Sequence, residues 1–406
     1  MRHAQNLRIE VQERLRQLAG QMRDWQEPPT ITDRERARIF ASLQSFRHST
    51  TAEPFCLAGV DGSGDYPSLT YADSFVYITV AQGTVYRFNP AYGLREDSPV
   101  FLPPPEFTWL PGEEAKCREE WMHAFERLAG NSILNIIERS DYRNLKAIAS
   151  GKNTPVDRLI RELICPHASD SGNIGIQLRT TAEMGLALKL IKSDLGIRFV
   201  LMDTTFSLPL VTRKDKSLFY EHLKRFCCVE ARERGIGFFA LSKSHGLPAI
   251  ELLEEIVRDK FGLPQGILAE HWYIRIPLKD QDDWELSLAD GRQLPPIGAV
   301  TYLFRFHRNV PVLRLDMDAE FWRTRVHRED PEETRANEAW IFEHLDYASH
   351  DQRSYGYPYP LKAGHDRASL TQAERASFRR QIIDAAVAAG MKRSVFRDAS
   401  MATGHK

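Results

Sequence analysis

The chain has 406 residues, a length that fits either one large α/β domain with insertions or two ordinary domains. Its 54 Lys and Arg residues nearly balance its 55 Asp and Glu residues, and the formal net charge of −1 excludes a protein coated in positive charge, such as an architectural DNA-binding protein. Hydrophobic residues at 42% and charged residues at 27% exclude wholesale disorder and predict a sizeable core.

Two helices are predicted in the first 50 residues. A narrow apolar stripe from Leu7 to Leu18 lies among Arg, Glu and Gln residues, and Thr32 or Asp33 is suited to cap a second helix that reaches Phe46. This segment carries nine Arg and six acidic residues. A solvated helical pair is the plain interpretation, and contact with a partner or with a second copy of the chain is the alternative.

Strand-like apolar runs begin after this segment. The run over residues 56–60 ends abruptly at Asp61. Two further strands are predicted over 75–80 and 84–88, with a hairpin turn at 81–83 between them.

Helices dominate the middle of the chain. One is predicted over about residues 113–149, with breaks expected at Gly130 and Ser140, and another over 180–195. A strand of the buried type over 198–202 ends at a second carboxylate, Asp203, and a third apolar strand covers 235–241. The rest of the chain is predicted to form a helix over 248–260, strands over 298–306 and 310–315, and helices over 332–345 and 371–389. This mixture of strands and helices predicts one α/β core with helical insertions.

The cysteines and the apolar runs bear on the compartment. Cys56, Cys117, Cys165, Cys227 and Cys228 form no CxxC pair, and an odd, scattered set predicts reduced thiols and neither a disulfide framework nor a zinc site built on cysteines. No apolar run approaches the roughly 18 to 20 residues that span a bilayer. The charged N-terminal stretch lacks the apolar region of a secretory signal. We therefore expect a soluble, cytoplasmic protein that does not enter a membrane.

Asp61 and Asp203 are the main candidates for chemistry. Each ends an apolar strand and is followed by small residues, and polar groups just beyond strand ends commonly line the ligand crevice of an α/β sheet. Carboxylates gathered from separate elements suit hard divalent cations such as Mg²⁺ and Mn²⁺, and two such ions can clamp the attacking and leaving oxygens of a phosphodiester displacement. Either aspartate alone is more often a turn former or a helix cap.

Three other residues add to this hypothesis. Glu183 is a carboxylate on a helix otherwise rich in apolar residues, Lys243 after the third strand is placed to neutralise a phosphate, and His365 is able to bind Mn²⁺ or to move a proton near neutral pH. The alternatives are ordinary ones: a surface glutamate beside Lys189 and Lys192, a solvated lysine at a strand end, and a histidine that is simply hydrogen-bonded.

Several common catalytic motifs do not occur in the sequence. It contains no GxxxxGK[ST] P-loop, no HExxH and no GxSxG. A GxGxxA match over residues 235–240 lies inside a predicted strand and does not open a helix. Without a P-loop, any ATP-driven movement of a substrate would come from another protein.

At this point the sequence resembles the NurA nuclease family, the partners of the HerA DNA translocase in DNA-end processing. Motifs similar to those of the family recur in order from about residue 55 to 385, and their order is more specific than any one of them. They are GVDGS at 59–63, FVLMDTTFSL at 199–208, FALSKS at 239–244, VLRLD at 312–316 and YGYPYPLKAGHDR at 355–367.

The resemblance implies a fold, an activity and partners. The expected fold is an RNase H-like mixed β-sheet core with helical insertions and terminal helices. The expected organisation is an N-terminal helical segment over 1–50, a nuclease domain over 51–390 with a helical insertion at about 113–195, and a tail over 391–406. The expected activity is that of a metal-dependent deoxyribonuclease, exonuclease and/or endonuclease, supported by Mn²⁺ or Mg²⁺. The expected partners are DNA, a second copy in a homodimer and a HerA-type hexameric ATPase, in DNA repair or anti-phage defence.

The resemblance also assigns roles residue by residue. The residues that would hold the metal are Asp61, Glu183, Asp203 and His365. Lys243 would add positive charge toward the scissile phosphate. Arg314 is suited either to that role or to an ion pair with Asp316 or Asp318. The family also uses a tyrosine, and the sequence leaves the choice between Tyr273 and Tyr302 open.

One departure from the family pattern favours a different class of function. The second Asp-Gly-Ser motif is replaced by Asp-Thr-Thr at residues 203–205, which keeps the carboxylate and adds bulk beside it. A catalytically weakened adaptor that binds and activates a HerA-type translocase is therefore the alternative function, and an RNA-directed RNase H-like nuclease is a third.

Charge is unevenly placed along the chain. Residues 361–406 contain nine basic and four acidic residues, beside His365. This local excess is expected to attract phosphates, whereas the near-neutral remainder is expected to bind free DNA weakly. We therefore expect that a motor partner threads DNA and that this chain supplies the cut.

Overall fold

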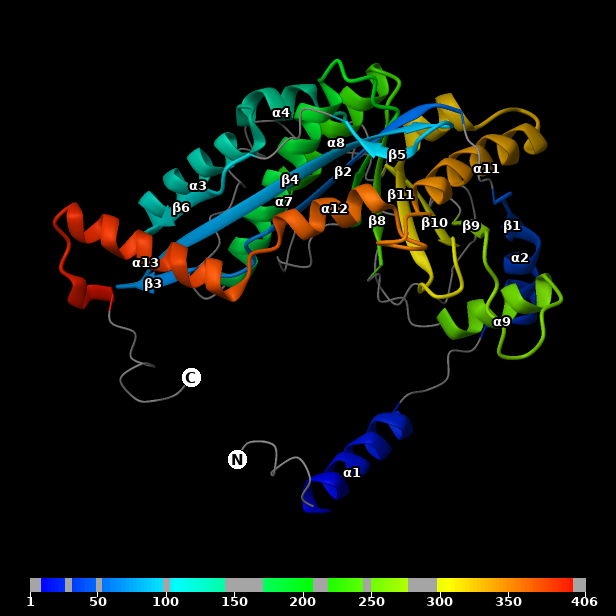
Figure 1. Ribbon diagram of the computed structural model, residues 1–406, viewed down its shortest axis with the longest axis horizontal. Coiled ribbons are helices and arrows are strands. Elements are labelled where there is room, and N and C mark those ends of the chain that lie inside the picture. The colour runs from blue at the N-terminus through cyan, green and yellow to red at the C-terminus, as the bar shows by residue number, and fades with distance from the viewer. Residues whose placement is uncertain are drawn as a thin grey trace, which may run out of the picture.

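A mixed β-sheet runs through the part of the chain that the structure describes (Figure 1). The computed structural model describes residues 9–25, 31–48, 53–97, 103–142, 171–206, 218–243, 250–276 and 298–396. The strands are β1 (Gln44–Ser45), β2 (Phe55–Ser63), β3 (Leu69–Tyr71), β4 (Ser74–Asn89), β5 (Gly93–Glu96), β6 (Glu106–Leu110), β7 (Phe199–Met202), β8 (Gly237–Ser242), β9 (Trp272–Ile276), β10 (Ala299–Arg305) and β11 (Leu313–Asp318).

The order of the strands makes the sheet mixed. Among the described residues it has 11 strands in the order β1-β9-β10-β11-β8-β7-β2-β4-β3, with β5 and β6 also paired to β4. β2, β7 and β8 are parallel neighbours, and the other pairs are antiparallel. The predicted α/β class with a mixed sheet is therefore confirmed, whereas the narrower RNase H-like assignment stays a prediction.

Helices cover the sheet, and one of them lies apart from it (Figure 1). They are α1 (Ile9–Trp25), α2 (Asp33–Ser42), α3 (Glu114–Ala129), α4 (Ile133–Arg139), α7 (Ser171–Ile191), α8 (Leu218–Glu233), α9 (Ile250–Lys260), α10 (Ala319–Phe321), α11 (Pro331–Ala348), α12 (Tyr359–Ala368) and α13 (Gln372–Ala388). The helix that lies apart is α1, whose apolar residues Leu15 and Leu18 are exposed. No described helix combines the length and the apolar character that a membrane crossing requires.

Alternating side chains of the central strands face two helical layers, because successive residues of a strand point to opposite faces. Val60, Val200 and Met202 join an apolar cluster with side chains of α3, α7 and α8. Leu57 lies three residues before Val60, and Leu201 lies between Val200 and Met202. Both point to the opposite face and join a second cluster with side chains of α11. The apolar runs recognised in the sequence are thus strands buried on both faces.

The hairpin predicted near residue 82 is wrong. Residues 81–83 continue strand β4 without a turn, because they are paired with residues 60–62 of β2. Gly83 leaves room there for helix α7, since a Cβ atom at this position would lie 3.2 Å from Leu190 Cδ1. The glycine that suggested a turn therefore lets a helix lie close to a strand.

The two breaks expected in the helical stretch over 113–149 are confirmed. The stretch divides into α3 and α4 at Gly130, which has a left-handed backbone with φ of 65°, α4 ends before Ser140, and residues 143–149 lie outside the described part. Helix α12 was not predicted from the sequence. Its Pro360 lies in the first turn, where the missing N–H of proline costs no helical hydrogen bond.

Candidate metal centre

The ends of the parallel strands bring three polar residues to one edge of the sheet. β2 and β7 are paired at Val60 and Met202, and β8 lies on the other side of β7. Asp203 and Lys243 follow just beyond β7 and β8, whereas Asp61 is still part of β2, which continues to Ser63 and does not end at Asp61 as the sequence predicted. Asp61 is the first residue of β2 beyond its pairing with β7, and the carboxyl ends of neighbouring parallel strands meet at the same edge, so the observed strand order gathers these residues.

Helix α12 lies against β2 at a position where only glycine fits. A Cβ atom on Gly59 would lie 2.4 Å from the carbonyl carbon of Pro360, which is backbone and cannot move aside. The Thr84 hydroxyl of β4 donates a hydrogen bond of 2.7 Å to the Pro360 carbonyl and fixes the same contact. This close approach carries His365, on the last turns of α12, to Asp61.

Asp61, Asp203 and His365 form one compact group. A ligand atom from each lies within 4.8 Å of the others, and Asp61 Oδ2 is 2.7 Å from His365 Nδ1. The other Asp61 oxygen accepts a hydrogen bond of 2.7 Å from the Gly62 N–H. Burial raises the pKa of Asp61, and the negative charge of Asp203 adds to that rise. Two carboxylates are therefore held together against their mutual repulsion.

Lys243 and Tyr357 surround Asp203. Lys243 Nζ lies 3.0 Å from Asp203 Oδ2, and it also lies 5.1 Å from the centre of the Tyr357 ring. Burial raises the pKa of the Tyr357 hydroxyl well above its usual range, and the charges of Asp203 and Asp61 raise it further. Tyr357 is therefore a neutral phenol beside the carboxylates, and Lys243 forms an ion pair with Asp203.

Glu183 lies beside this group and outside it. A Cβ atom on Gly62 would lie 2.7 Å from Glu183 Oε1, so the carboxylate occupies the space that this glycine leaves. Because Asp61 and Gly62 are consecutive in β2, His365 and Glu183 approach the strand from opposite faces. Burial raises the pKa of Glu183 to about 8, against the lowering effect of Arg179, whose Nε lies 3.4 Å away.

The donor set of the compact group fits a divalent cation. Its two carboxylates are ligands that Mn²⁺ and Mg²⁺ prefer, and its imidazole is a ligand that transition-metal ions accept. A cation would also relieve the repulsion that raises the pKa of Asp61. The structure thus gathers three of the four residues predicted to hold the metal, and it places Glu183 next to them.

The tyrosine beside the compact group is Tyr357, and neither Tyr273 nor Tyr302 lies there. The Tyr273 hydroxyl donates to the Arg335 carbonyl at 3.3 Å, and the Tyr302 hydroxyl donates to Glu338 at 2.8 Å, so both are engaged with α11. Tyr357, by contrast, faces the carboxylates of the compact group. The signal for it was present in the sequence, because Tyr357 and His365 lie in the same segment similar to the family.

Arg314 forms the ion pair that was its alternative role. Its Nε and Nη2 atoms lie 2.9 Å from the two oxygens of Asp316. Asp316 also accepts a hydrogen bond of 2.8 Å from the backbone N–H of Phe206, three residues after Asp203. The pair therefore anchors the segment that carries Asp203.

The two threonines that replace Gly-Ser are accommodated in this segment. Thr204 and Thr205 are half-buried, and the Thr204 N–H donates a hydrogen bond of 3.0 Å to the Met202 carbonyl. The turn after β7 is thus closed by the backbone. The added methyl groups do not prevent Asp203 from joining Asp61 and His365.

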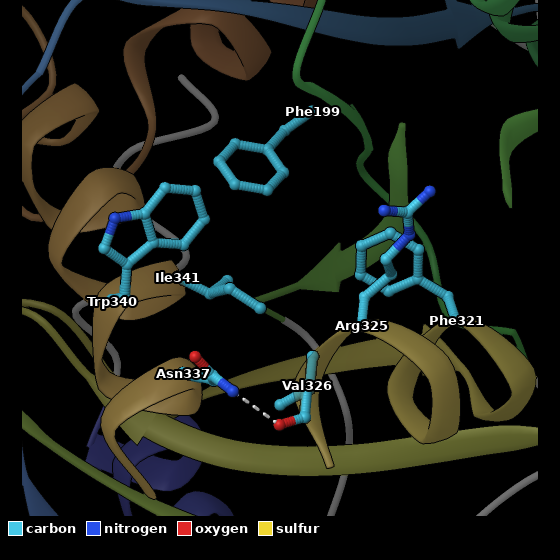
Figure 2. A pocket seen from close by; sticks show the side chains of 7 residues that line it. All are labelled: Phe199, Phe321, Arg325, Val326, Asn337, Trp340 and Ile341. Carbon is cyan, nitrogen blue, oxygen red and sulfur yellow. Dashed lines mark hydrogen bonds between the residues drawn. The ribbon is translucent and has the colours of Figure 1, made fainter. Parts of the chain in front are cut away.

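The pocket drawn in Figure 2 lies at the other end of β7. It has a volume of about 300 Å³, and Phe199, the first residue of β7, lines it. Trp340 and Ile341 give it a largely apolar wall, and the Asn337 amide donates a hydrogen bond of 2.9 Å to a backbone carbonyl. Nothing in this lining resembles the acidic group, so the candidate site is the group at the strand ends.

Comparisons with known proteins find similarity to solved structures of NurA. No protein-family model matches the chain, and no curated protein sequence matches it. The NurA nuclease from Sulfolobus solfataricus is similar over 97% of this chain and 99% of its own, at 13% identity and a TM-score of 0.42. A second NurA structure covers 95% of this chain and 98% of its own at 12% identity and a TM-score of 0.39.

A structure of NurA with manganese is also similar, over 95% of this chain and 98% of its own, at 14% identity and a TM-score of 0.34. These structures belong to the family that the sequence motifs resemble. At such TM-scores the likeness assigns no role to any residue, and the site rests on the geometry described above.

Proposed function

We propose that this chain is a metal-dependent DNA nuclease that hydrolyses phosphodiester bonds. The observation that carries the proposal is the compact group of Asp61, Asp203 and His365, whose ligand atoms lie within 4.8 Å of one another at the ends of parallel strands. The choice of DNA as substrate follows from the ordered motifs that resemble the NurA family.

Asp61, Asp203 and His365 would hold Mn²⁺ or Mg²⁺, whose charge would polarise the phosphodiester and lower the pKa of an attacking water. Lys243 is 44% exposed at its side chain, so its ammonium is free to exchange Asp203 for a phosphate oxygen of the substrate. Tyr357 stays protonated and is able to donate a hydrogen bond to Asp203, which orients that carboxylate.

Glu183 is the residue best placed to handle a proton. Its pKa of about 8 lies close to neutral pH, where a carboxyl group both accepts and releases a proton readily. Hydrolysis adds the hydroxyl of water to phosphorus, breaks the P–O bond to the leaving group and gives that oxygen a proton. Glu183, which holds a proton below about pH 8, would donate it to the leaving oxygen, and the proton released by the attacking water would restore it.

The partners of the proposed nuclease follow from the same resemblance. We include a HerA-type hexameric ATPase and a homodimer in the proposal, with a role in DNA repair or anti-phage defence. The lack of a P-loop and the net charge of −1 support a division of labour in which a motor moves DNA and this chain cuts it.

Cleavage assays test the proposal directly. Linear duplex DNA, single-stranded DNA and RNA are each incubated with the full chain in Mn²⁺, in Mg²⁺ and in EDTA. We expect cleavage of DNA that requires the metal, and we expect Asp61→Asn to reduce it by at least about 100-fold. Asp384→Asn removes an exposed aspartate of α13 and is the matched control, with unchanged cleavage expected.

Two outcomes would redirect the proposal. Metal-dependent cleavage that survives Asp61→Asn undiminished would contradict the site. Absence of cleavage by the wild-type chain, together with stimulation of ATP hydrolysis by a HerA-type hexamer, would favour the adaptor. That alternative is kept because the threonines after Asp203 add bulk where the family has Gly-Ser.

A further inference from the structure

A second group of metal-binding side chains lies away from the strand ends that carry Asp61. It consists of His48, which follows β1, His271, which precedes β9, Asp346 in the last turn of α11, and His350 just beyond that helix. One ligand atom from each lies within 4.8 Å of the others. Three segments that are far apart in the sequence therefore meet here: the segment after β1, the residue before β9 and the end of α11.

The carboxylate of this group lacks a partner for one of its oxygens. Asp346 is fully buried, and its Oδ2 lies 2.7 Å from His48 Nδ1. Its Oδ1 is also buried and has no hydrogen-bond partner among the described residues, and His271 Nε2 lies 3.8 Å from it. A buried carboxylate oxygen without a partner is costly, and a cation in the group would satisfy it.

The imidazoles crowd together around that oxygen. The ring centres of His48 and His271 are 4.8 Å apart, and those of His48 and His350 are 4.1 Å apart. The rings thus bring their nitrogen atoms close together, and the imidazole nitrogen is the commonest metal ligand in proteins. His271 also adopts a φ of 58°, a backbone conformation that few non-glycine residues take.

The chemistry of the donors selects the class of metal. Three imidazole nitrogens and one carboxylate oxygen suit Zn²⁺ and related transition ions better than Mg²⁺ or Ca²⁺, which prefer oxygen. Tetrahedral bonds to zinc would place the donors about 3.3 Å apart. The half-buried side chains of His48, His271 and His350 are able to close that distance by small rotations, whereas Asp346 is fixed on its helix.

We propose that His48, His271, Asp346 and His350 bind one Zn²⁺ ion in a structural site. Four protein ligands complete a tetrahedron and leave no position for a substrate, which distinguishes a structural zinc from a catalytic one. The ion would tie the segment after β1 and the start of β9 to the end of α11. The same elements already meet in the core, where the Phe342 ring of α11 stacks on Phe46 and on Tyr273.

A neighbouring histidine provides a matched control. His307 lies close to the group, but its Nδ1 accepts a hydrogen bond of 3.2 Å from the Asn309 N–H, and its Nε2 lies 3.8 Å from Glu270. Both of its nitrogens therefore have other partners, and neither belongs to the group of four ligand atoms. His307→Ala should remove a histidine from the same region without removing a ligand.

Metal content of the full chain tests the site independently of the proposed nuclease function. The chain is produced with Asp61→Asn and Asp203→Asn, so that the first group binds no ion, and its zinc is measured by mass spectrometry after dialysis. We expect about one zinc per chain, a loss of that zinc in His271→Ala and in His350→Ala, and its retention in His307→Ala. Equal zinc in the ligand variants and their parent would overturn the proposal, and so would its loss in His307→Ala alone.

A second measurement does not depend on whether a ligand variant folds. The metal-free chain with both aspartate substitutions is titrated with Co²⁺, which gives intense visible absorption only in a tetrahedral site. We expect saturation at one Co²⁺ per chain and displacement by Zn²⁺, with a rise in melting temperature on zinc addition. Absence of both the absorption and the rise would show that the group is only a hydrogen-bonded histidine cluster.

Discussion

Glu183 makes the stability of the metal-free chain depend on pH. The ordinary pKa of 4.5 applies to the unfolded chain, whereas burial raises the pKa of Glu183 to about 8 in the folded chain. Between these values the folded chain retains a proton that the unfolded chain has released. The free energy of unfolding therefore falls as pH rises through this window, by about 1.4 kcal/mol for each pH unit.

Replacement by glutamine removes this dependence. Glu183→Gln keeps the shape of the side chain and cannot ionise, so its stability relative to the wild type should increase from pH 5 upward. The difference in free energy of unfolding between the variant and the wild type should exceed its value at pH 4.5 by roughly 3 kcal/mol at pH 7 and by about 5 kcal/mol above pH 8. Loss of the contact with Arg179 shifts the stability of the variant by a similar amount at every pH in this range, and it leaves the slope unaffected.

The assay is denaturant unfolding in EDTA at a series of pH values between 4.5 and 8.5. The difference between the variant and the wild type isolates Glu183, because other titrating groups are common to both chains. Glu251→Gln, which removes an exposed glutamate of α9, controls for the loss of one negative charge. Stability curves of wild type and Glu183→Gln that run parallel across this range would refute the reasoning.

Three further predictions concern the same site. Gly59→Ala should destabilise the chain by about 1 to 3 kcal/mol in denaturant unfolding, because its Cβ would collide with the Pro360 backbone. Lys243→Met should reduce the rate of DNA cleavage by about 100-fold while calorimetry still detects Mn²⁺ binding, because the ammonium is proposed to contact phosphate. Tyr357→Phe should reduce cleavage by about 10-fold with unchanged melting temperature, since it removes only the hydroxyl that faces Asp203.

The sequence predicted the parts of the site that depend on apolar runs. A run buried on both faces shows where a strand lies, and the first polar residue after it marks a candidate site residue. Asp61 and Asp203 were found in this way, although β2 continues past Asp61 to Ser63. The parallel pairing of β2 with β7, which brings the two together, could not be predicted from local hydrophobicity.

The parts that depend on long-range contacts could not be predicted in the same way. Tyr357 faces the carboxylates only because α12 and the segment before it cross β2. The proline and glycine residues in that part of the chain gave no local pattern typical of a helix. The turn expected at 81–83 failed because pairing with β2 overrides the local preference of glycine. In both cases tertiary contacts decide the conformation of residues whose own preferences point elsewhere.

Strand β2 explains why the proposed site has two kinds of carboxyl group. Successive residues of β2 point to opposite faces, so the Asp61 side chain faces α12 and the space beside Gly62 faces α7. The strand therefore lies between His365 and Glu183. On the α12 side, Asp61 has a backbone hydrogen bond and the imidazole, and this environment suits a metal ligand. On the α7 side, Glu183 is buried, and its raised pKa suits proton exchange. In the proposed mechanism, consecutive residues of one strand would thus divide metal binding from proton transfer, and Gly62 would be as necessary as Asp61.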